Sequence, residues 1–77
     1  MTFKQYLKRY INKNSILGDF ASDFFRDTNA PDNFEDFEQL HKYMWSITQF
    51  PCKEAVQAAK LLYKRYTKLA SHQVASN

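Results

Sequence analysis

Cysteine, glycine and proline are scarce in this chain. Its 77 residues include one Cys, one Gly and two Pro. A single cysteine excludes an intramolecular disulfide, and we expect Cys52 to be a buried or half-buried small apolar residue in a reducing compartment. β-Branched residues are also sparse, and apolar residues recur at spacings of three and four rather than two. The sequence therefore predicts an all-helical protein.

Long apolar runs are absent as well. No run approaches the roughly 18 residues that a membrane span requires. The residues after Met1 soon become amphipathic, without the apolar segment of a signal peptide. We therefore expect a cytoplasmic protein with no membrane partner.

The chain also lacks the motifs of catalytic, metal and nucleotide sites. His41 and His72 are far apart, with no Cys or His companion at ligand spacing. Asp32, Glu35 and Asp36 lack the glycine and the alternating oxygen ligands of a calcium loop. We expect no enzymatic activity, no cofactor, no metal and no small-molecule substrate.

Aromatic residues, in contrast, are plentiful. Seven Phe, five Tyr and one Trp make up 17% of the chain. A domain this small buries only about 60% of its unfolded surface, so large side chains must supply its core. We expect one helical domain over residues 1–70. The periodicity stops after Ala70, so residues 71–77 are predicted to form a flexible C-terminal tail.

The apolar spacing predicts a compact bundle of four or five helices with a long C-terminal helix. Thr2 and Ser15 are candidate N-caps, and Pro51 suits the first position of a helix. Gly18 lies inside the second helix at a cost of about 1 kcal/mol relative to Ala, which a close approach of another helix would explain. The expected ranges are residues 3–11, 16–27, 34–46 and 51–69.

Core aromatics also follow a recognisable order over residues 2–44. The order is carried by Thr2–Leu7, Tyr10, Phe20–Ala21, Asp27, Pro31 and Asp36–Met44. It resembles the YozE family, small Firmicute proteins with a sterile-alpha-motif-like helical fold. The resemblance implies that fold, but no functional residue, because the family has no established activity. The family's last segment is acidic around a Trp, whereas here it is basic, and we expect Tyr63 to replace that Trp in the core.

Charge is sorted along the chain. Residues 1–13 carry a net charge of +4, residues 14–41 carry −6 and residues 42–77 carry +5, within a total of +3. Separated charge orients partners and speeds their encounter without specifying a fold. The pattern predicts a non-catalytic binding module.

The bases form the first candidate binding face. If the first and last helices lie side by side, their bases form one patch. Such a patch would bind along a phosphate backbone or to an acidic protein. The plain alternative is a solvated helix face. The candidates are Lys4, Lys8, Arg9, Lys53, Lys60, Lys64, Arg65 and Lys68.

The acids form a second candidate face. A basic partner would bind here, and a second copy of the chain, arranged head-to-tail, is one such partner. The plain alternative is that the acids match helix dipoles at N-termini. The candidates are Asp32, Glu35, Asp36 and Glu38, and Asp23 and Asp27 are possible additional members of this face.

Three apolar residues fit poorly into the expected core, namely Trp45, Phe50 and Leu61. At the surface they would supply contact energy for a partner, whereas the alternative is that Trp45 and Phe50 close the core between the last two helices. The sequence thus favours protein–protein binding through opposed basic and acidic faces. The alternative is direct DNA or RNA binding by the basic N- and C-terminal helices, in a phage or mobile-element context.

Overall fold

A computed structural model describes the backbone of residues 1–47 and 52–75, and the side chains of residues 1–47 and 52–70. Within this part of the chain there are four helices and no strand, which confirms the all-helical prediction. The helices are α1 (Phe3–Leu7), α2 (Ile16–Arg26), α3 (Phe37–Ile47) and α4 (Lys53–Ala75).

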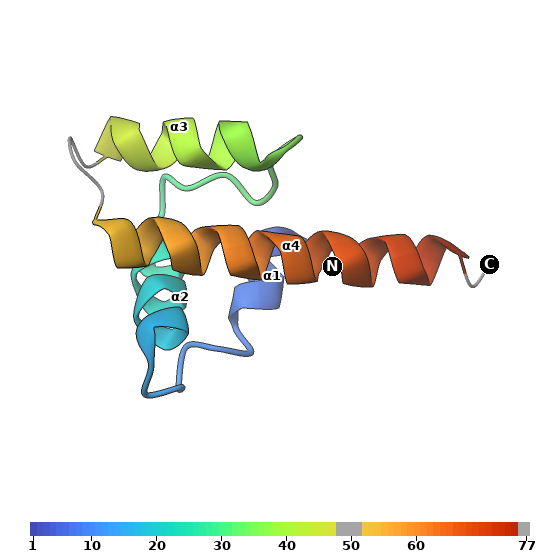
Figure 1. Ribbon diagram of the computed structural model, residues 1–77, viewed down its shortest axis with the longest axis horizontal. Coiled ribbons are helices and arrows are strands. Elements are labelled where there is room, and N and C mark those ends of the chain that lie inside the picture. The colour runs from blue at the N-terminus through green and yellow to red at the C-terminus, as the bar shows by residue number, and fades with distance from the viewer. Residues whose placement is uncertain (48–51, 76–77) are drawn as a thin grey trace.

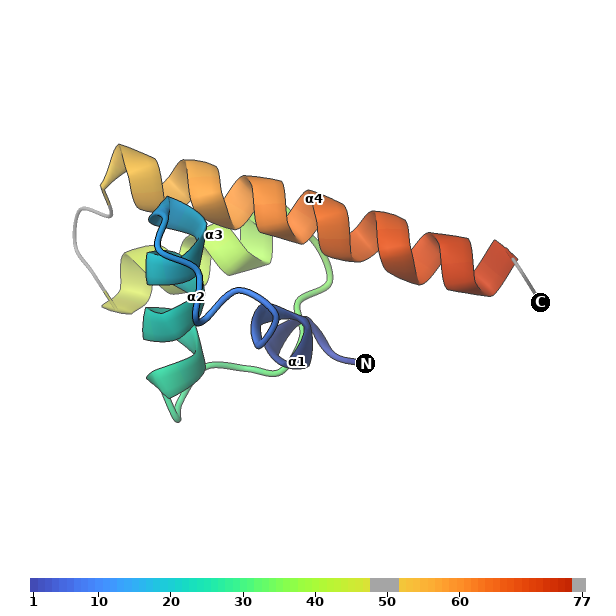
Figure 2. The same cartoon turned by 90° about the horizontal axis from the view of Figure 1, so that it is seen from below.

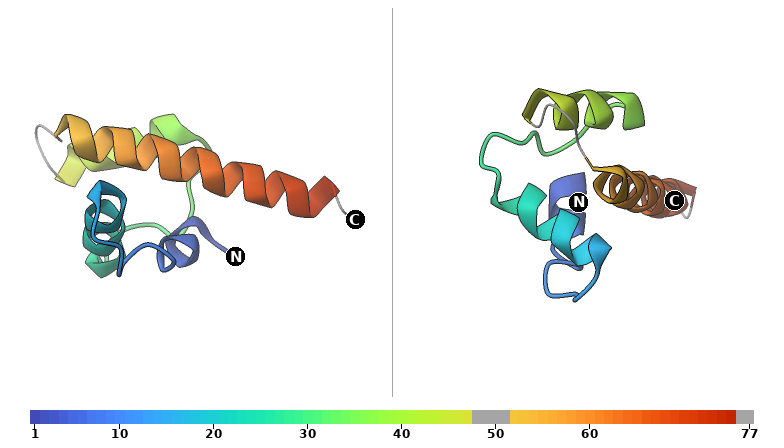
Figure 3. Two further views of the ribbon diagram at one scale, coloured as in Figure 1. Left: turned by 60° about the horizontal axis from the view of Figure 1, so that its bottom comes forward. Right: turned by 60° about the vertical axis from the view of Figure 1, so that its left-hand side comes forward.

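The molecule is built around α4, which runs along its longest dimension (Figure 1). Its principal extents are 41 × 26 × 22 Å. Helix α3 lies beside the first part of α4 and runs antiparallel to it, while α2 crosses α4 and α1 packs next to α2 (Figures 2 and 3). The C-terminal part of α4 projects beyond the other helices (Figures 1 and 2).

The two predicted N-caps are confirmed. Thr2 and Gln5 form a capping box, in which the backbone N–H of Gln5 donates to Thr2 Oγ1 at 3.1 Å and the Thr2 N–H donates to Gln5 Oε1 at 3.0 Å. Ser15 Oγ accepts from the backbone N–H of Gly18 at 3.3 Å. Each cap satisfies donors that a helix start would leave unpaired.

The helix boundaries differ from those predicted by three residues or more at three places. Helix α1 ends at Leu7 rather than near Ile11, because the backbone N–H of Tyr10 bonds the Leu7 carbonyl three residues back at 2.9 Å. Helix α3 begins at Phe37 rather than Phe34.

The third difference lies at the end of the chain. Helix α4 continues to Ala75, six residues beyond the predicted end at Leu69. It begins at Lys53, and Pro51 lies outside the described residues. The flexibility of residues 71–77 and the domain boundary at residue 70 stay predictions.

Phe3 is the centre of the core. Its side chain is fully buried, and four aromatic rings surround it with centroid distances of 5.4–6.3 Å. Tyr63 is 8% exposed and donates its hydroxyl proton to the Phe34 carbonyl at 3.0 Å, which confirms its place in the core. The rings around Phe3 belong to Phe24, Phe34, Tyr63 and Tyr66.

Gly18 packs against backbone, but not against the backbone of another helix. A Cβ at this position would overlap the carbonyl oxygen of Lys13 and lie 2.9 Å from that of Tyr10. Both carbonyls belong to the segment between α1 and α2. The prediction of a close approach is confirmed, whereas its assignment to a helix–helix contact is wrong.

Candidate interaction surfaces

Lys4, a residue of the predicted basic face, has its ammonium group committed to the fold. Its Nζ donates to the carbonyl oxygens of Asp27 at 2.9 Å and of Ala30 at 3.4 Å. Lys8 lies over the ring of Phe25, 5.6 Å from its centroid. Both side chains therefore contact α2 and the turn that follows it, and Lys4 does not extend a patch toward α4.

A second group of bases lies where the segment after α1 meets α4. Arg65 Nη1 donates to the Tyr10 hydroxyl at 3.4 Å, and the guanidinium of Arg9 lies 5.3 Å from the ring centroid of Tyr6. We call Arg9, Tyr10 and Arg65 the basic tyrosine cluster. This cluster brings bases from the N-terminal segment and from α4 together, which is part of the predicted side-by-side arrangement.

The phenols of this region differ in acidity. The hydroxyl oxygens of Tyr6 and Tyr10 lie 3.1 Å apart. Burial and this hydrogen bond raise the pKa of Tyr6 to about 12. The bond with Tyr6, aided by the positive charge of Arg65, lowers the pKa of Tyr10. The more acidic phenol is thus the one beside the guanidinium.

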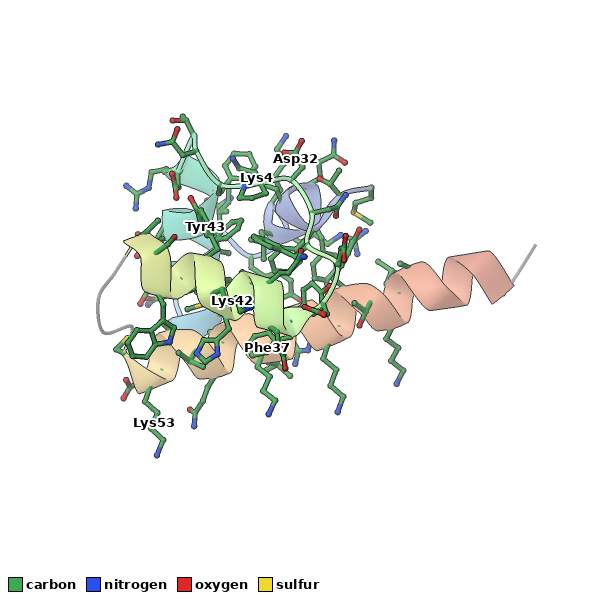
Figure 4. All side chains as sticks on the ribbon, turned by 90° about the horizontal axis from the view of Figure 1, so that it is seen from above. Lys4, Asp32, Phe37, Lys42, Tyr43 and Lys53 are labelled. Atoms are coloured by element: carbon green, nitrogen blue, oxygen red, sulfur yellow. The ribbon has the colours of Figure 1, made fainter. Side chains whose placement is uncertain are left out.

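The lysines of α4 form a row along one side of the helix. Their spacing of seven, four and four residues places them on the same side, and all are exposed. Figure 4 shows Lys53 pointing away from the body of the molecule. We call these residues the lysine row: Lys53, Lys60, Lys64 and Lys68.

The predicted acidic face lies on the turn before α3 and on its first residues, where all four acids are exposed. Asp36 caps the helix, because its Oδ1 accepts from the backbone N–H of Gln39 at 3.0 Å. Gln39 Oε1 in turn accepts from the backbone N–H of Glu35 at 2.9 Å. The carboxylate of Asp36 therefore caps α3. Among the described residues, no hydrogen bond or ion pair is found for the carboxylates of Asp32, Glu35 or Glu38.

Opposite charges seldom meet on this surface. Among the described residues, the single ion pair within 4.0 Å joins Arg26 to Asp23 at 3.1 Å. Their side chains are 74% and 80% exposed. The lysine row has no carboxylate within that distance in the same part of the chain, so its charge is balanced by solvent and ions rather than by neighbours.

The predicted apolar surface residues are only partly described. Trp45 is 48% exposed and Leu61 is 40% exposed, which places both at the surface, while Phe50 lies outside the described residues. Trp45 Nε1 donates to His41 Nε2 at 3.1 Å, and the His41 ring stacks on Phe37 with centroids 5.6 Å apart. These three side chains form an aromatic ladder along α3 (Figure 4 labels Phe37).

Sequence reasoning missed a groove of about 340 Å³ between α2, the end of α3 and the start of α4. Figure 1 shows these three segments at the same end of the molecule, opposite the C-terminus. We call it the acidic groove. Its apolar lining consists of Ile16, Phe20, Phe24, Met44, Ile47, Cys52 and Ala55, and its acids are Asp19, Asp23, Asp27 and Glu54.

The signal for this groove was present in the sequence. Ile16, Phe20 and Phe24 repeat every four residues, and Asp19, Asp23 and Asp27 repeat at the same interval three residues later. Such rows run side by side on a helix surface. Cys52, which was expected to be buried or half-buried, is exposed at the groove instead.

The described residues contain neither a metal-binding cluster nor a membrane-spanning helix. No three His, Cys, Asp or Glu side chains are grouped so that they could hold a metal ion. No helix in that part of the chain is long and apolar enough to cross a membrane.

Comparison with known proteins finds a family model that matches the chain. The family model for the YozE SAM-like fold matches residues 2–68 of the chain. No curated protein and no solved structure matches it.

Proposed function

The chain belongs to the YozE family, with its SAM-like fold, and from that premise we propose a non-catalytic interaction module that binds another protein through opposed basic and acidic faces. The partner that we propose is a protein in the cytoplasm. Binding it requires no cofactor, small-molecule substrate or catalytic group.

The observation that carries the proposal is the near absence of internal charge pairing. The chain has 11 Lys and Arg and eight Asp and Glu, yet one ion pair joins them among the described residues. Unpaired surface charges of one sign project a field that draws in and orients a complementary surface. Neighbouring salt bridges would have cancelled that field.

Exposed apolar side chains supply the second component. Trp45 and Leu61 keep 48% and 40% of their surface in water, and a bound protein would cover them. Buried Trp, Tyr and Arg side chains carry most of the free energy of association, which makes Trp45 the stronger candidate anchor, whereas charges at the rim mainly affect the association rate.

The lysine row is the face to test first. The variant Lys60→Glu/Lys64→Glu reverses two of its charges, and Lys13→Glu/Lys42→Glu makes the same change in net charge elsewhere. Tagged wild-type protein and both variants would be used to capture partners from an extract of the source cells, with circular dichroism as the folding control. We expect the row variant to lose proteins that the wild type and the control retain.

Two further measurements decide between classes of partner. Labelled duplex and single-stranded DNA and RNA are titrated at low and moderate salt, and sedimentation is followed over a range of protein concentrations. Protein capture without nucleic-acid binding at low salt supports the proposal, and concentration-dependent association would identify the chain itself as the partner. Nucleic-acid binding that disappears in the row variant would overturn the proposal in favour of nucleic acid.

A further inference from the structure

We propose that the acidic groove binds a basic amphipathic helix of the partner protein. This inference rests on the proposed function and adds the place of binding and the chemistry of the bound segment. It concerns Asp19, Asp23, Asp27 and Glu54, and not the acids at the start of α3.

The lining of the groove is largely apolar. Ile16 is 53% exposed and Ile47 is 55% exposed, the highest values among the described Leu and Ile side chains, whereas Phe20 and Phe24 are 8% and 4% exposed and form the base of the groove. The row Ile16, Phe20 and Phe24 covers nine residues of α2, or about 12 Å from the first to the last at 1.5 Å per residue. That length equals about two turns of a bound helix, which would present apolar residues at i, i+3 or i+4, and i+7.

The rim of the groove carries charge of one sign. Among the described lining residues there are four carboxylates and no Lys or Arg. Asp27 is held in place by a hydrogen bond that the Tyr43 hydroxyl donates to its Oδ2. Asp23 pairs with Arg26, but the pair is largely exposed and therefore weak, so Asp23 is easily recruited by a stronger cation.

The partner helix is foreign to this chain rather than part of a second copy. The large apolar side chains that are exposed in the described residues are Met1, Ile16, Trp45, Ile47 and Leu61. Of these, only Leu61 lies among the bases of α4. A second copy of α4 would thus bring a single exposed apolar side chain to the groove, whereas a helix with a full apolar stripe flanked by Lys or Arg matches both the apolar lining and the acidic rim.

The test uses a designed peptide as the probe. A labelled helical peptide of Leu and Lys, with Leu at i, i+3, i+4 and i+7, is titrated with the full chain and followed by fluorescence anisotropy. A peptide of Leu and Glu with the same pattern is the probe of opposite charge. We expect the Leu/Lys peptide to bind and the Leu/Glu peptide to bind at least about tenfold more weakly.

Matched variants locate the binding. Asp19→Asn/Glu54→Gln alters the groove, and Asn12→Lys/Thr67→Lys makes the same change in net charge at exposed positions outside both the groove and the acidic face. We expect the first to weaken binding of the Leu/Lys peptide by about tenfold or more and the second by about twofold or less. Ile47 is exposed, so its substitution by Asn should be tolerated by the fold. We expect Ile47→Asn to weaken binding of the Leu/Lys peptide without altering the net charge.

Three results would overturn the inference. They are equal weakening by the groove variant and its charge-matched control, preferential binding of the Leu/Glu peptide, and self-association that the groove variant abolishes. Failure here is distinguishable from failure of the proposed function. If the row variant loses captured proteins while the groove variants retain them and bind the peptide as wild type does, the interaction module stands and the groove is not its docking site.

Discussion

Gly18 occupies a position on α2 where a side chain has no room. Substitution by Ala would push a methyl group against the carbonyl oxygens of Lys13 and Tyr10. Helix propensity alone favours Ala by about 1 kcal/mol, but overpacking against backbone costs about 1–3 kcal/mol. We expect Gly18→Ala to lower the free energy of unfolding in urea denaturation. Ser22→Ala in the same helix is the control, and a Gly18→Ala variant more stable than wild type would contradict the packing described.

Lys4 illustrates a charge that serves the fold rather than a partner. Its ammonium group donates to the carbonyl oxygens of Asp27 and Ala30, after the end of α2. We expect Lys4→Met to lower the free energy of unfolding by about 1–2 kcal/mol, since a hydrogen bond from a charged donor is lost. Lys64→Met, which removes an exposed lysine, should change it by less than about 0.5 kcal/mol. Equal effects of the two substitutions would refute this role of Lys4.

Asp27 links α2 to α3 through Tyr43, and the link depends on pH. The hydrogen bond from the Tyr43 hydroxyl, helped by the backbone N–H of Asn29, lowers the pKa of Asp27 below its usual 3.8. Because the folded pKa is below the unfolded one, the stabilisation is complete above about pH 3.8 and is lost as the pH falls through the folded pKa.

Tyr43→Phe tests this link by removing the donor. Its melting temperature should therefore be lower than that of the wild type at neutral pH, and the difference should shrink as the pH falls below 3.8. Burial raises the pKa of Tyr43 to about 12, so the phenol keeps its proton throughout this range. A difference that stays constant from neutral to acidic pH would exclude Asp27 ionisation as the cause.

Among the elements, local signals were readable in the sequence and non-local ones were not. The caps at Thr2 and Ser15 involve residues three positions apart, so short-range spacing sufficed to predict them. Phe34 fits the apolar spacing of α3, yet it lies before the helix and packs its ring 6.3 Å from that of Phe3. Apolar periodicity cannot distinguish a helical core residue from a loop residue that reaches the same core.

Local spacing does not reveal contacts between distant residues, and this also explains which surface features could be predicted. The solvent-exposed lysines of α4 follow from helical spacing alone, and they were predicted. The role of Lys4 depends on carbonyls 23 and 26 residues away, which no local pattern contains. The acidic groove is formed by residues of α2, α3 and α4. The apolar row and the acidic row on α2 therefore line a groove only once α3 and α4 pack beside them, which the sequence of α2 alone does not reveal.

The core residues described on helix α4 all lie before its last turns. Leu69 is the last of them, and the helix continues to Ala75. We expect a chain that ends at Ala70 to differ from the full chain by less than about 0.5 kcal/mol in free energy of unfolding. Leu69→Ala in the full chain should cost about 1–2 kcal/mol, less than the value for a fully buried leucine. A truncated chain that unfolds as readily as Leu69→Ala would show that the last turns carry part of the stability.

For the whole molecule, charge affects association more than folding. One exposed ion pair in the described residues can contribute little to stability, and salt screens it further. We expect the free energy of unfolding to change by less than about 0.5 kcal/mol between low and moderate sodium chloride. Over the same range the affinity for the Leu/Lys peptide should fall several-fold. A large loss of stability on adding salt would indicate attractive pairing that the structure does not contain.

The N-terminal residues pack against a helix that is synthesised about 60 residues later. Phe3 packs against Tyr63 and Tyr66, and the Tyr66 hydroxyl donates to the carbonyl oxygen of Met1 at 3.0 Å. During translation, Phe3 therefore lacks two of the four aromatic rings around it until Tyr63 and Tyr66 have left the ribosome. A nascent chain that stalls before α4 would leave this side of Phe3 uncovered.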